Sequence, residues 1–278
     1  MIKITAAEVN NLRKITGAGM MDCKKALQES DGDVEKAIDI LRKKGQKVAS
    51  KRADKAASEG LVIAKTSADK KFAAIVMVNC ETDFVAKNVD FAAFVDQIAE
   101  LAIAKAPKSI DELKGLDLNS RTVEENLLDQ VGKIGEKIEL NGYKFVESPI
   151  TFAYNHMGNK LGTVIGLSKA DVNGIDDIGK ELAMQVAAMN PVAVDTKDIS
   201  EEVIQKEIEI GKDQARQEGK PEELLEKIAM GKLNKFYKES TLLNQDFVRD
   251  TKKSVRQYLS ETDKDLKVSG FQRVMLGV

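Results

Sequence analysis

Apolar residues near the start of the chain recur at helical spacing in three short stretches. The first opens with Thr5-Ala6-Ala7-Glu8, a capping-box pattern in which a hydroxyl and a carboxylate satisfy free N–H groups of the first turn. It is expected to stop at Thr16-Gly17-Ala18-Gly19. A second helix is predicted over 20–29, and a third after the turn Asp31-Gly32-Asp33. These stretches predict a three-helix module over residues 1–50.

The third helix is expected to end at Lys43-Lys44-Gly45, because glycine commonly terminates helices. The residues that follow, QKVASKRADKAASEG, are basic and rich in alanine and show no clear apolar face. Such a composition is typical of a tether or a loosely packed helix between domains. We therefore expect a linker over residues 51–59.

The spacing changes from helical to β-type at residue 60. Residues 61–64 and 72–78 are rich in β-branched and other apolar residues and are separated by a polar turn, which is the pattern of a hairpin. A helix over 91–105 follows and is stopped by Pro107. This ββα unit, with a further helix after it, predicts a core subdomain over residues 60–141.

A second copy of the ββα pattern follows. Residues 150–154 and 161–167 read as its strands, and its helix ends before Pro191. The strands of the two copies match at an offset of 89 residues, whereas the helix ends match at 84, so the first copy has five extra residues. We expect them between strand and helix, where Thr82-Asp83-Phe84-Val85 lies, and a lengthened connector suggests a functional loop. The second core subdomain is predicted over residues 142–198.

Two heavily charged helices with narrow apolar rows are expected over residues 199–240. They are joined by Gly219-Lys220-Pro221, which favours an antiparallel coiled-coil hairpin inserted into the body and projecting from it. The residues expected in the rows are Ile199, Val203, Ile204, Ile208, Ile210 and Ala215 on one helix and Leu225, Ile228, Ala229, Leu233 and Phe236 on the other. A C-terminal segment over 241–278 completes the core. The predicted fold class is α+β.

Composition excludes several classes of protein. The 278 residues carry 43 basic and 45 acidic side chains, a net charge of −2, so no overall field recruits nucleic acid, although a local patch stays open. Cys23 and Cys80 lie far apart with no CxxC spacing, which predicts a reduced cytosolic protein with no metal or other cofactor. No apolar run approaches the roughly 18 residues of a membrane span, and no leader pattern is present, so we expect an unprocessed cytoplasmic protein.

Candidate chemistry is sparse. The sequence has no GxxxxGK[ST] phosphate loop, no strand-linked GxGxxG and no GxSxG to accompany its single histidine, His156. His156 is expected to be either a buried structural imidazole or an interface contact. Glu81 and Asp83 would make a poor acid pair, since alternate residues of a strand point to opposite faces. For Phe84, composition alone leaves both core packing and an exposed anchor open.

Two blocks of the sequence resemble bacterial elongation factor Ts: residues 16–27, TGAGMMDCKKAL, and residues 79–88, NCETDFVAKN. The resemblance implies a guanine-nucleotide exchange factor for elongation factor Tu that has no catalytic chemistry of its own. It also implies an N-terminal module like a ubiquitin-associated domain, two related core subdomains, a protruding coiled coil and a C-terminal segment.

The same resemblance implies roles for individual residues. The loop Thr82-Asp83-Phe84-Val85 would enter the GTPase domain of elongation factor Tu, with the ring of Phe84 beside the switch region and Asp83 disturbing the magnesium site. Disordering the magnesium shell would weaken nucleotide binding, because the ion bridges phosphate oxygens and holds switch elements. The resemblance implies that five further residues of this chain contact elongation factor Tu: Lys24, Ile134, Gly135, His156 and Val248. Met157 and Asn159 depart from the small residues expected after the histidine.

Other interpretations stay open at this point. The helical module and the hairpin could make the chain an adaptor without exchange activity, and Glu81, Asp83 and His156 could serve an acid–base enzyme. The expected partner is elongation factor Tu in its nucleotide-free and GDP-bound states, with no direct nucleic acid and no membrane, and a homodimer through the hairpin is left open. The chain ends at Gly277-Val278, where longer family members are expected to carry an acidic helix whose contacts would be absent or replaced.

Overall fold

The structure, a computed structural model, describes residues 3–277 apart from the side chain of Met157. The helices are α1 (Ala6–Thr16), α2 (Met20–Glu29), α3 (Val34–Arg52), α4 (Asp83–Ala86), α5 (Val89–Lys105), α6 (Ile110–Gly115), α7 (Val123–Ile134), α8 (Ile175–Met189), α9 (Glu201–Gln217), α10 (Glu222–Ser240) and α11 (Val255–Thr262). The strands are β1 (Glu59–Thr66), β2 (Phe72–Cys80), β3 (Asp117–Leu118), β4 (Arg121–Thr122), β5 (Ile138–Glu147), β6 (Ile150–Asn155), β7 (Leu161–Leu167), β8 (Asp246–Phe247), β9 (Asp250–Ser254) and β10 (Val268–Met275). Three 3₁₀ turns complete the elements: η1 (Met157–Asn159), η2 (Thr196–Asp198) and η3 (Leu242–Asn244). The mixture confirms the predicted α+β class.

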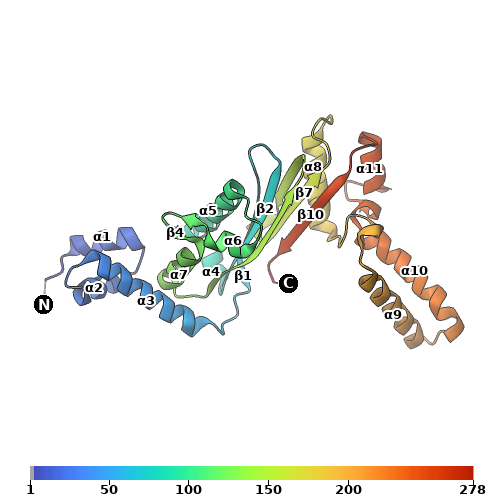
Figure 1. Cartoon of the computed structure of the whole chain (residues 1–278). Helices are drawn as coiled ribbons and strands as arrows, with labels where there is room; N and C mark the ends of the chain where they lie inside the picture. The colour runs from blue at the N-terminus through green and yellow to red at the C-terminus, as the bar shows by residue number, and fades with distance from the viewer. Residues whose placement is uncertain (1–2, 278) are drawn as a thin grey trace.

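Figure 1 shows an elongated molecule, with α1–α3 at one end, two sheets in the middle and the long helices α9 and α10 at the other end. Within residues 3–277, no helix combines the length and the apolar character that crossing a membrane requires.

The first three helices pack around a small apolar core. Thr5 and Glu8 form the predicted capping box of α1, and Gly17 ends that helix with φ 67°, in the left-handed region that favours glycine. The side chains buried between the helices are Val9, Leu12, Cys23, Ala26, Leu27 and Ala37.

The predicted end of the third helix is wrong, because α3 continues through Gly45 to Arg52. Gly45 is buried where α3 crosses α7, and a Cβ atom placed on Gly132 of α7 would lie 3.0 Å from the Cα atom of Gly45. A glycine inside a helix costs about 1 kcal/mol relative to alanine. Here the missing side chains let the two helix backbones approach closely, so tertiary packing overrides the local stop signal. Residues 46–52 therefore belong to a packed helix, whereas only Lys51 and Arg52 of the linker expected over 51–59 are helical.

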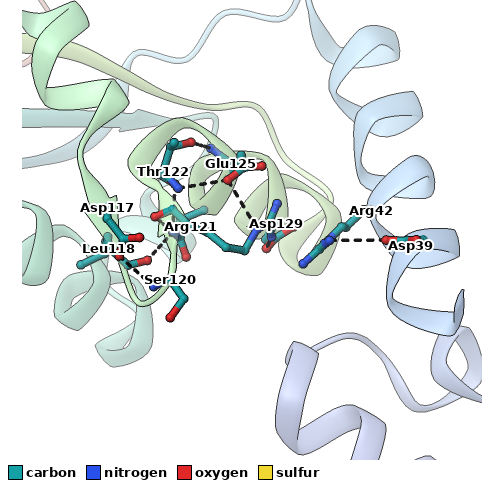
Figure 2. Close-up of polar contacts among 10 residues, drawn as sticks. Asp39, Arg42, Asp117, Leu118, Ser120, Arg121, Thr122, Glu125 and Asp129 are labelled. Atoms are coloured by element: carbon teal, nitrogen blue, oxygen red, sulfur yellow. Dashed lines mark hydrogen bonds and ion pairs between the residues drawn. The ribbon is translucent and has the colours of Figure 1, made fainter. Parts of the chain in front are cut away.

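Polar side chains lie beside the same crossing, and the contacts drawn in Figure 2 are made within α3 and within residues 117–129. Thr122 and Glu125 form a capping box at the start of α7, and Arg121 forms ion pairs with Asp129 and, at 3.7 Å, with Glu125. Burial raises the pKa of Asp129, and the positive charges of Arg121 and Arg42, the latter on α3, oppose that shift. Attraction across the crossing thus adds to the close backbone contact.

The two sheets have the same connectivity. The first has the order β1-β2-β5 and the second the order β10-β7-β6, with all neighbours antiparallel. In each, a hairpin is followed by a helix and then by a third strand beside the second strand of the hairpin. The repeat is therefore ββαβ rather than ββα. The third strands, β5 and β10, are separated from the helices α5 and α8 by segments of different length. A search for one fixed offset between the two copies therefore could not detect them.

The strand β5 crosses the boundary expected between residues 141 and 142. It pairs with β2 from Phe72 opposite Glu147 to Cys80 opposite Ile138, and it belongs to the first sheet. The pairing buries Ile138 and Leu140 in the core beneath α5.

The expected long connector in the first copy is also wrong. β2 has nine residues where β7 has seven, and α5 has seventeen where α8 has fifteen. Most of the extra length therefore extends the strand and the helix, and connectors 81–88 and 168–174 differ by one residue. What distinguishes the first connector is its conformation, because it contains the helical turn α4.

The two sheets stack face to face, with α5 and α8 on the outer sides. Along β1, Leu61 and Ile63 face the α5 side, while Val62 and Ala64 lie in the cluster between the sheets. A Cβ atom on Gly162 of β7 would come within 2.9 Å of Val62 Cγ1, so this glycine permits the close stacking.

The helices α9 and α10 lie side by side and extend from the body (Figure 1). Two residues expected in their buried rows, Val203 and Ile210, are instead 37% and 39% exposed, because the contact runs along a neighbouring face. The residues buried at this contact are Ile208, Gly211 and Ala215 on α9 and Leu225, Ala229 and Leu233 on α10.

Candidate functional site

Phe84 projects from the surface on the single helical turn α4. Its side chain is 83% exposed, more than any other large apolar residue described, whereas the next residue but one, Ala86, is buried against the core. Thr82 caps the turn by accepting a hydrogen bond from the Val85 N–H at 3.4 Å. The core-packing interpretation of Phe84 is therefore wrong, and the exposed position is the observed one.

The turn is attached to the residues that follow α7. The backbone N–H of Thr82 donates to Glu136 Oε2 at 3.0 Å, and its hydroxyl donates to Glu136 Oε1 at 2.7 Å. Next to this pair, the Lys137 N–H donates to Glu81 Oε1 at 2.6 Å. Two charged side chains thus connect two loops through charge-assisted hydrogen bonds, which are about twice as strong as neutral ones.

Cys80 anchors the start of the turn from below. Its buried thiol donates to the Thr82 carbonyl oxygen at 3.2 Å, and burial raises the pKa of Cys80 to about 11. The thiol is consequently neutral near pH 7, and its contribution here is packing and a weak hydrogen bond.

Asp83 stands beside the exposed ring as a carboxylate. Its Oδ2 atom lies 2.6 Å from Lys87 Nζ, and this hydrogen bond lowers the pKa of Asp83. Both groups are on the surface, so the pair can exchange partners at little energetic expense. A negative charge is thus held one residue from the Phe84 ring.

Ile134 and Gly135 position Glu136. Ile134 is the last residue of α7, and Gly135 turns the chain with φ 83°, which a residue with a side chain rarely adopts. The chain leaves the helix in the direction that brings Glu136 to Thr82. The structure therefore joins these two predicted contacts to the predicted loop, by way of a residue that was not predicted.

His156 and Val248 line one surface groove of about 300 Å³. His156 is exposed, and its Nδ1 atom lies 3.0 Å from the Tyr154 hydroxyl, so the buried-imidazole interpretation is wrong. Val248 is 48% exposed, and its N–H donates to the buried Gln185 Oε1 at 2.8 Å. The other lining residues are Leu161, Glu181, Met184, Ala187, Ala188 and Arg249.

The three residues of the acid–base interpretation are engaged elsewhere. Glu81 pairs with Arg52 at 3.0 Å, Asp83 with Lys87 and His156 with Tyr154. Across residues 3–277, no group of three histidine, cysteine or acidic side chains is placed to hold a metal ion.

Known proteins resemble this chain over nearly all of its length. The family profile described as Elongation factor TS matches residues 81–278, which include α4 and the groove. The chain belongs to the elongation factor Ts family. Elongation factor Ts of Christiangramia forsetii is 50% identical over 277 residues, covering 100% of both chains, and that of Cytophaga hutchinsonii is 51% identical, covering 99% of this chain and 100% of its own. Elongation factor Ts of Amoebophilus asiaticus is 47% identical and covers 99% of each chain.

The remaining predicted contact, Lys24, lies apart from α4. It is exposed on α2, in the helical module at the end of the molecule (Figure 1). Three large apolar side chains near it in sequence, Ile15, Met20 and Met21, are each more than half exposed. A single partner that contacts both Lys24 and the Phe84 turn would therefore have to span the module and the core.

Several residues of the site were missed by sequence reasoning. Val89, at the start of α5, is 79% exposed and follows Phe84 by five residues. It lies before the helix expected over 91–105 and was not singled out from the sequence. Glu136 gave a faint signal, as an acid directly after a helix-ending glycine, but Arg52 gave none, since its partner lies 29 residues away.

Proposed function

We propose that this member of the elongation factor Ts family is a guanine-nucleotide exchange factor, which binds elongation factor Tu and promotes the release of GDP. The observation that carries the proposal is Phe84, an aromatic ring 83% exposed on a turn that hydrogen bonds hold in place. Aromatic side chains dominate the energetics of many interfaces, and a fixed ring loses little freedom on binding.

The mechanism follows from the turn. Phe84 inserts beside the switch region of the GTPase domain, and the carboxylate of Asp83 arrives next to the magnesium site. Magnesium holds the phosphates and the switch elements together, so disturbing its shell loosens the nucleotide. By thermodynamic linkage, a factor that binds the nucleotide-free state more tightly weakens the affinity for GDP by the same ratio.

Further contacts supply affinity. The Ile134–Gly135 turn adjoins α4 through Glu136, while Lys24 on α2 and the groove lined by His156 and Val248 are separate surfaces. One large partner would contact all three. We assign α1–α3 as the module like a ubiquitin-associated domain and α9–α10 as the family's coiled coil. A factor that acts on elongation factor Tu would function in the cytoplasm, where translation takes place.

The proposal is tested by the release of a fluorescent GDP analogue from elongation factor Tu of the same source. Catalytic amounts of the factor should accelerate release in magnesium buffer, and the acceleration should shrink when EDTA removes the ion beforehand. An equal acceleration in EDTA would contradict action through the magnesium site. Stable binding without any acceleration would favour an adaptor.

A further inference from the structure

The helix α3 joins two parts of the proposed partner surface, the neighbourhood of Lys24 and the Phe84 turn. Lys44 forms an ion pair with Asp22 on α2, two residues before Lys24. At the last residue of α3, Arg52 Nη1 donates to Glu81 Oε2 at 3.0 Å, three residues before Phe84. Eight helical residues span about 12 Å, so one rigid element joins the neighbourhoods of the two contacts.

Contacts along α3 keep it from sliding or rotating. Between the two ion pairs, Gly45 is buried against Gly132 of α7, where an added Cβ atom would meet backbone at 3.0 Å. Just beyond the helix, the Lys137 ammonium donates to the Ala53 carbonyl oxygen at 2.8 Å. The position of Arg52 relative to the core is therefore fixed by packing.

Glu81 is where α3 meets the turn. Its side chain is 14% exposed, and its two oxygens are divided between the Lys137 N–H and Arg52. Removing Arg52 would leave a largely buried carboxylate with one partner, which is strongly unfavourable. The chain at Glu81 and Thr82 would then be free to rearrange, and Phe84 with it.

We propose that Arg52 is a positioning residue for nucleotide exchange, holding the Phe84 turn at a fixed place relative to the helical module. The inference rests on the proposed exchange function. Because the module and the turn are arranged before the partner arrives, association does not have to order them. Arg52 needs no contact with elongation factor Tu for this role.

The test measures kcat and KM for GDP release with Arg52→Ala, Arg52→Lys and the matched control Lys47→Ala, an exposed cation on the same helix. Arg52→Ala should lower kcat/KM by about five- to twentyfold, as expected for loss of an indirect contribution to an anchor. Arg52→Lys should recover part of the loss, because an ammonium can reach one Glu81 oxygen but lacks the planar fork. Lys47→Ala should match the wild type. If Arg52→Ala does not fold, Arg52→Gln, which keeps most of the side-chain volume, replaces it.

A double-mutant cycle with Phe84→Ala distinguishes positioning from general stability. If Arg52 acts through Phe84, adding Arg52→Ala to Phe84→Ala should reduce kcat/KM no further. If the fold-losses in kcat/KM of the two single variants multiply in the double variant, or if Arg52→Ala is as active as the wild type, the inference is overturned while the exchange function stands. A wild-type factor that never accelerates release would instead overturn the proposed function, so the two failures are distinguishable.

Discussion

Thr82 and Glu136 are joined by two hydrogen bonds, one from the backbone N–H and one from the hydroxyl of the threonine, to the two carboxylate oxygens of the glutamate. The pair connects α4 to the turn after α7 across 54 residues of sequence. Phe84 thus projects from an end that is fixed by charge-assisted bonds. This arrangement can be tested independently of the ring itself.

Replacing Glu136 by alanine should slow exchange without unfolding the factor. The two Thr82 donors would turn to water, and the Phe84 turn would sample other positions, so kcat/KM should fall by roughly five- to fiftyfold, the range of one to two lost hydrogen bonds to a charged group. Glu124→Ala, which removes an exposed acid from the first turn of α7, is the control and should change little. Equal exchange rates for both variants would show that the two hydrogen bonds between Thr82 and Glu136 do not contribute to exchange.

The crossing of α3 and α7 predicts opposite outcomes for two glycine-to-alanine changes. Gly132→Ala places a methyl group 3.0 Å from Gly45 Cα and should destabilise the protein by about 1–3 kcal/mol, as overpacking does. Gly231→Ala on α10 meets nothing within 4 Å and should stabilise it by about 0.5–1 kcal/mol through helix propensity. Urea unfolding of the two variants measures both. A stabilising Gly132→Ala would mean that the helices are not in close contact.

The thiol of Cys80 should report on opening of the turn. With its pKa raised to about 11 by burial, only about one molecule in a thousand carries a thiolate at pH 8, so labelling by a disulfide reagent should be very slow in the native state. The ordinary cysteine pKa is about 8.5, so the unfolded chain loses this proton first and native stability should fall as pH rises from about 8.5 towards 11. Peptide mapping after timed labelling identifies the modified cysteine. Fast native modification of Cys80 would contradict the buried, capped geometry.

The groove should contribute affinity rather than rate. His156→Ala and Val248→Ala remove contacts on a surface away from the magnesium site, so KM should rise about three- to tenfold while kcat stays near the wild-type value. Val192→Ala changes another exposed valine outside the groove, 61% exposed against 48% for Val248, and is the control. A lower kcat with unchanged KM would place these residues in the exchange step instead.

Local sequence patterns correctly predicted elements that are stabilised by residues close together in sequence. They failed where contacts between residues far apart in sequence determine the structure. The capping box at Thr5 and Glu8 and the hairpin between β1 and β2 depend on neighbours and were found. The end of α3 was misplaced because Gly45 is a stop signal only when no second helix packs against it.

The candidate site shows the same division. The exposure of Phe84 could not be derived from composition, which left burial and exposure both open, and was expected only through the resemblance of its motif to a known family. Glu136 and Arg52, which hold the turn, lie 54 and 29 residues away in sequence from their partners Thr82 and Glu81. Helical or strand periodicity cannot predict contacts between residues so far apart.

The most direct measurement is the maximal rate of GDP-analogue release from elongation factor Tu at saturating factor, for the wild type, Phe84→Ala and the control Leu224→Ala, which truncates an exposed apolar side chain on α10. We expect Phe84→Ala to lower this rate about ten- to a hundredfold, as loss of a dominant interface anchor does, and Leu224→Ala to leave it unchanged. A folded Phe84→Ala factor that releases GDP as fast as the wild type would show that Phe84 is not the residue that drives exchange.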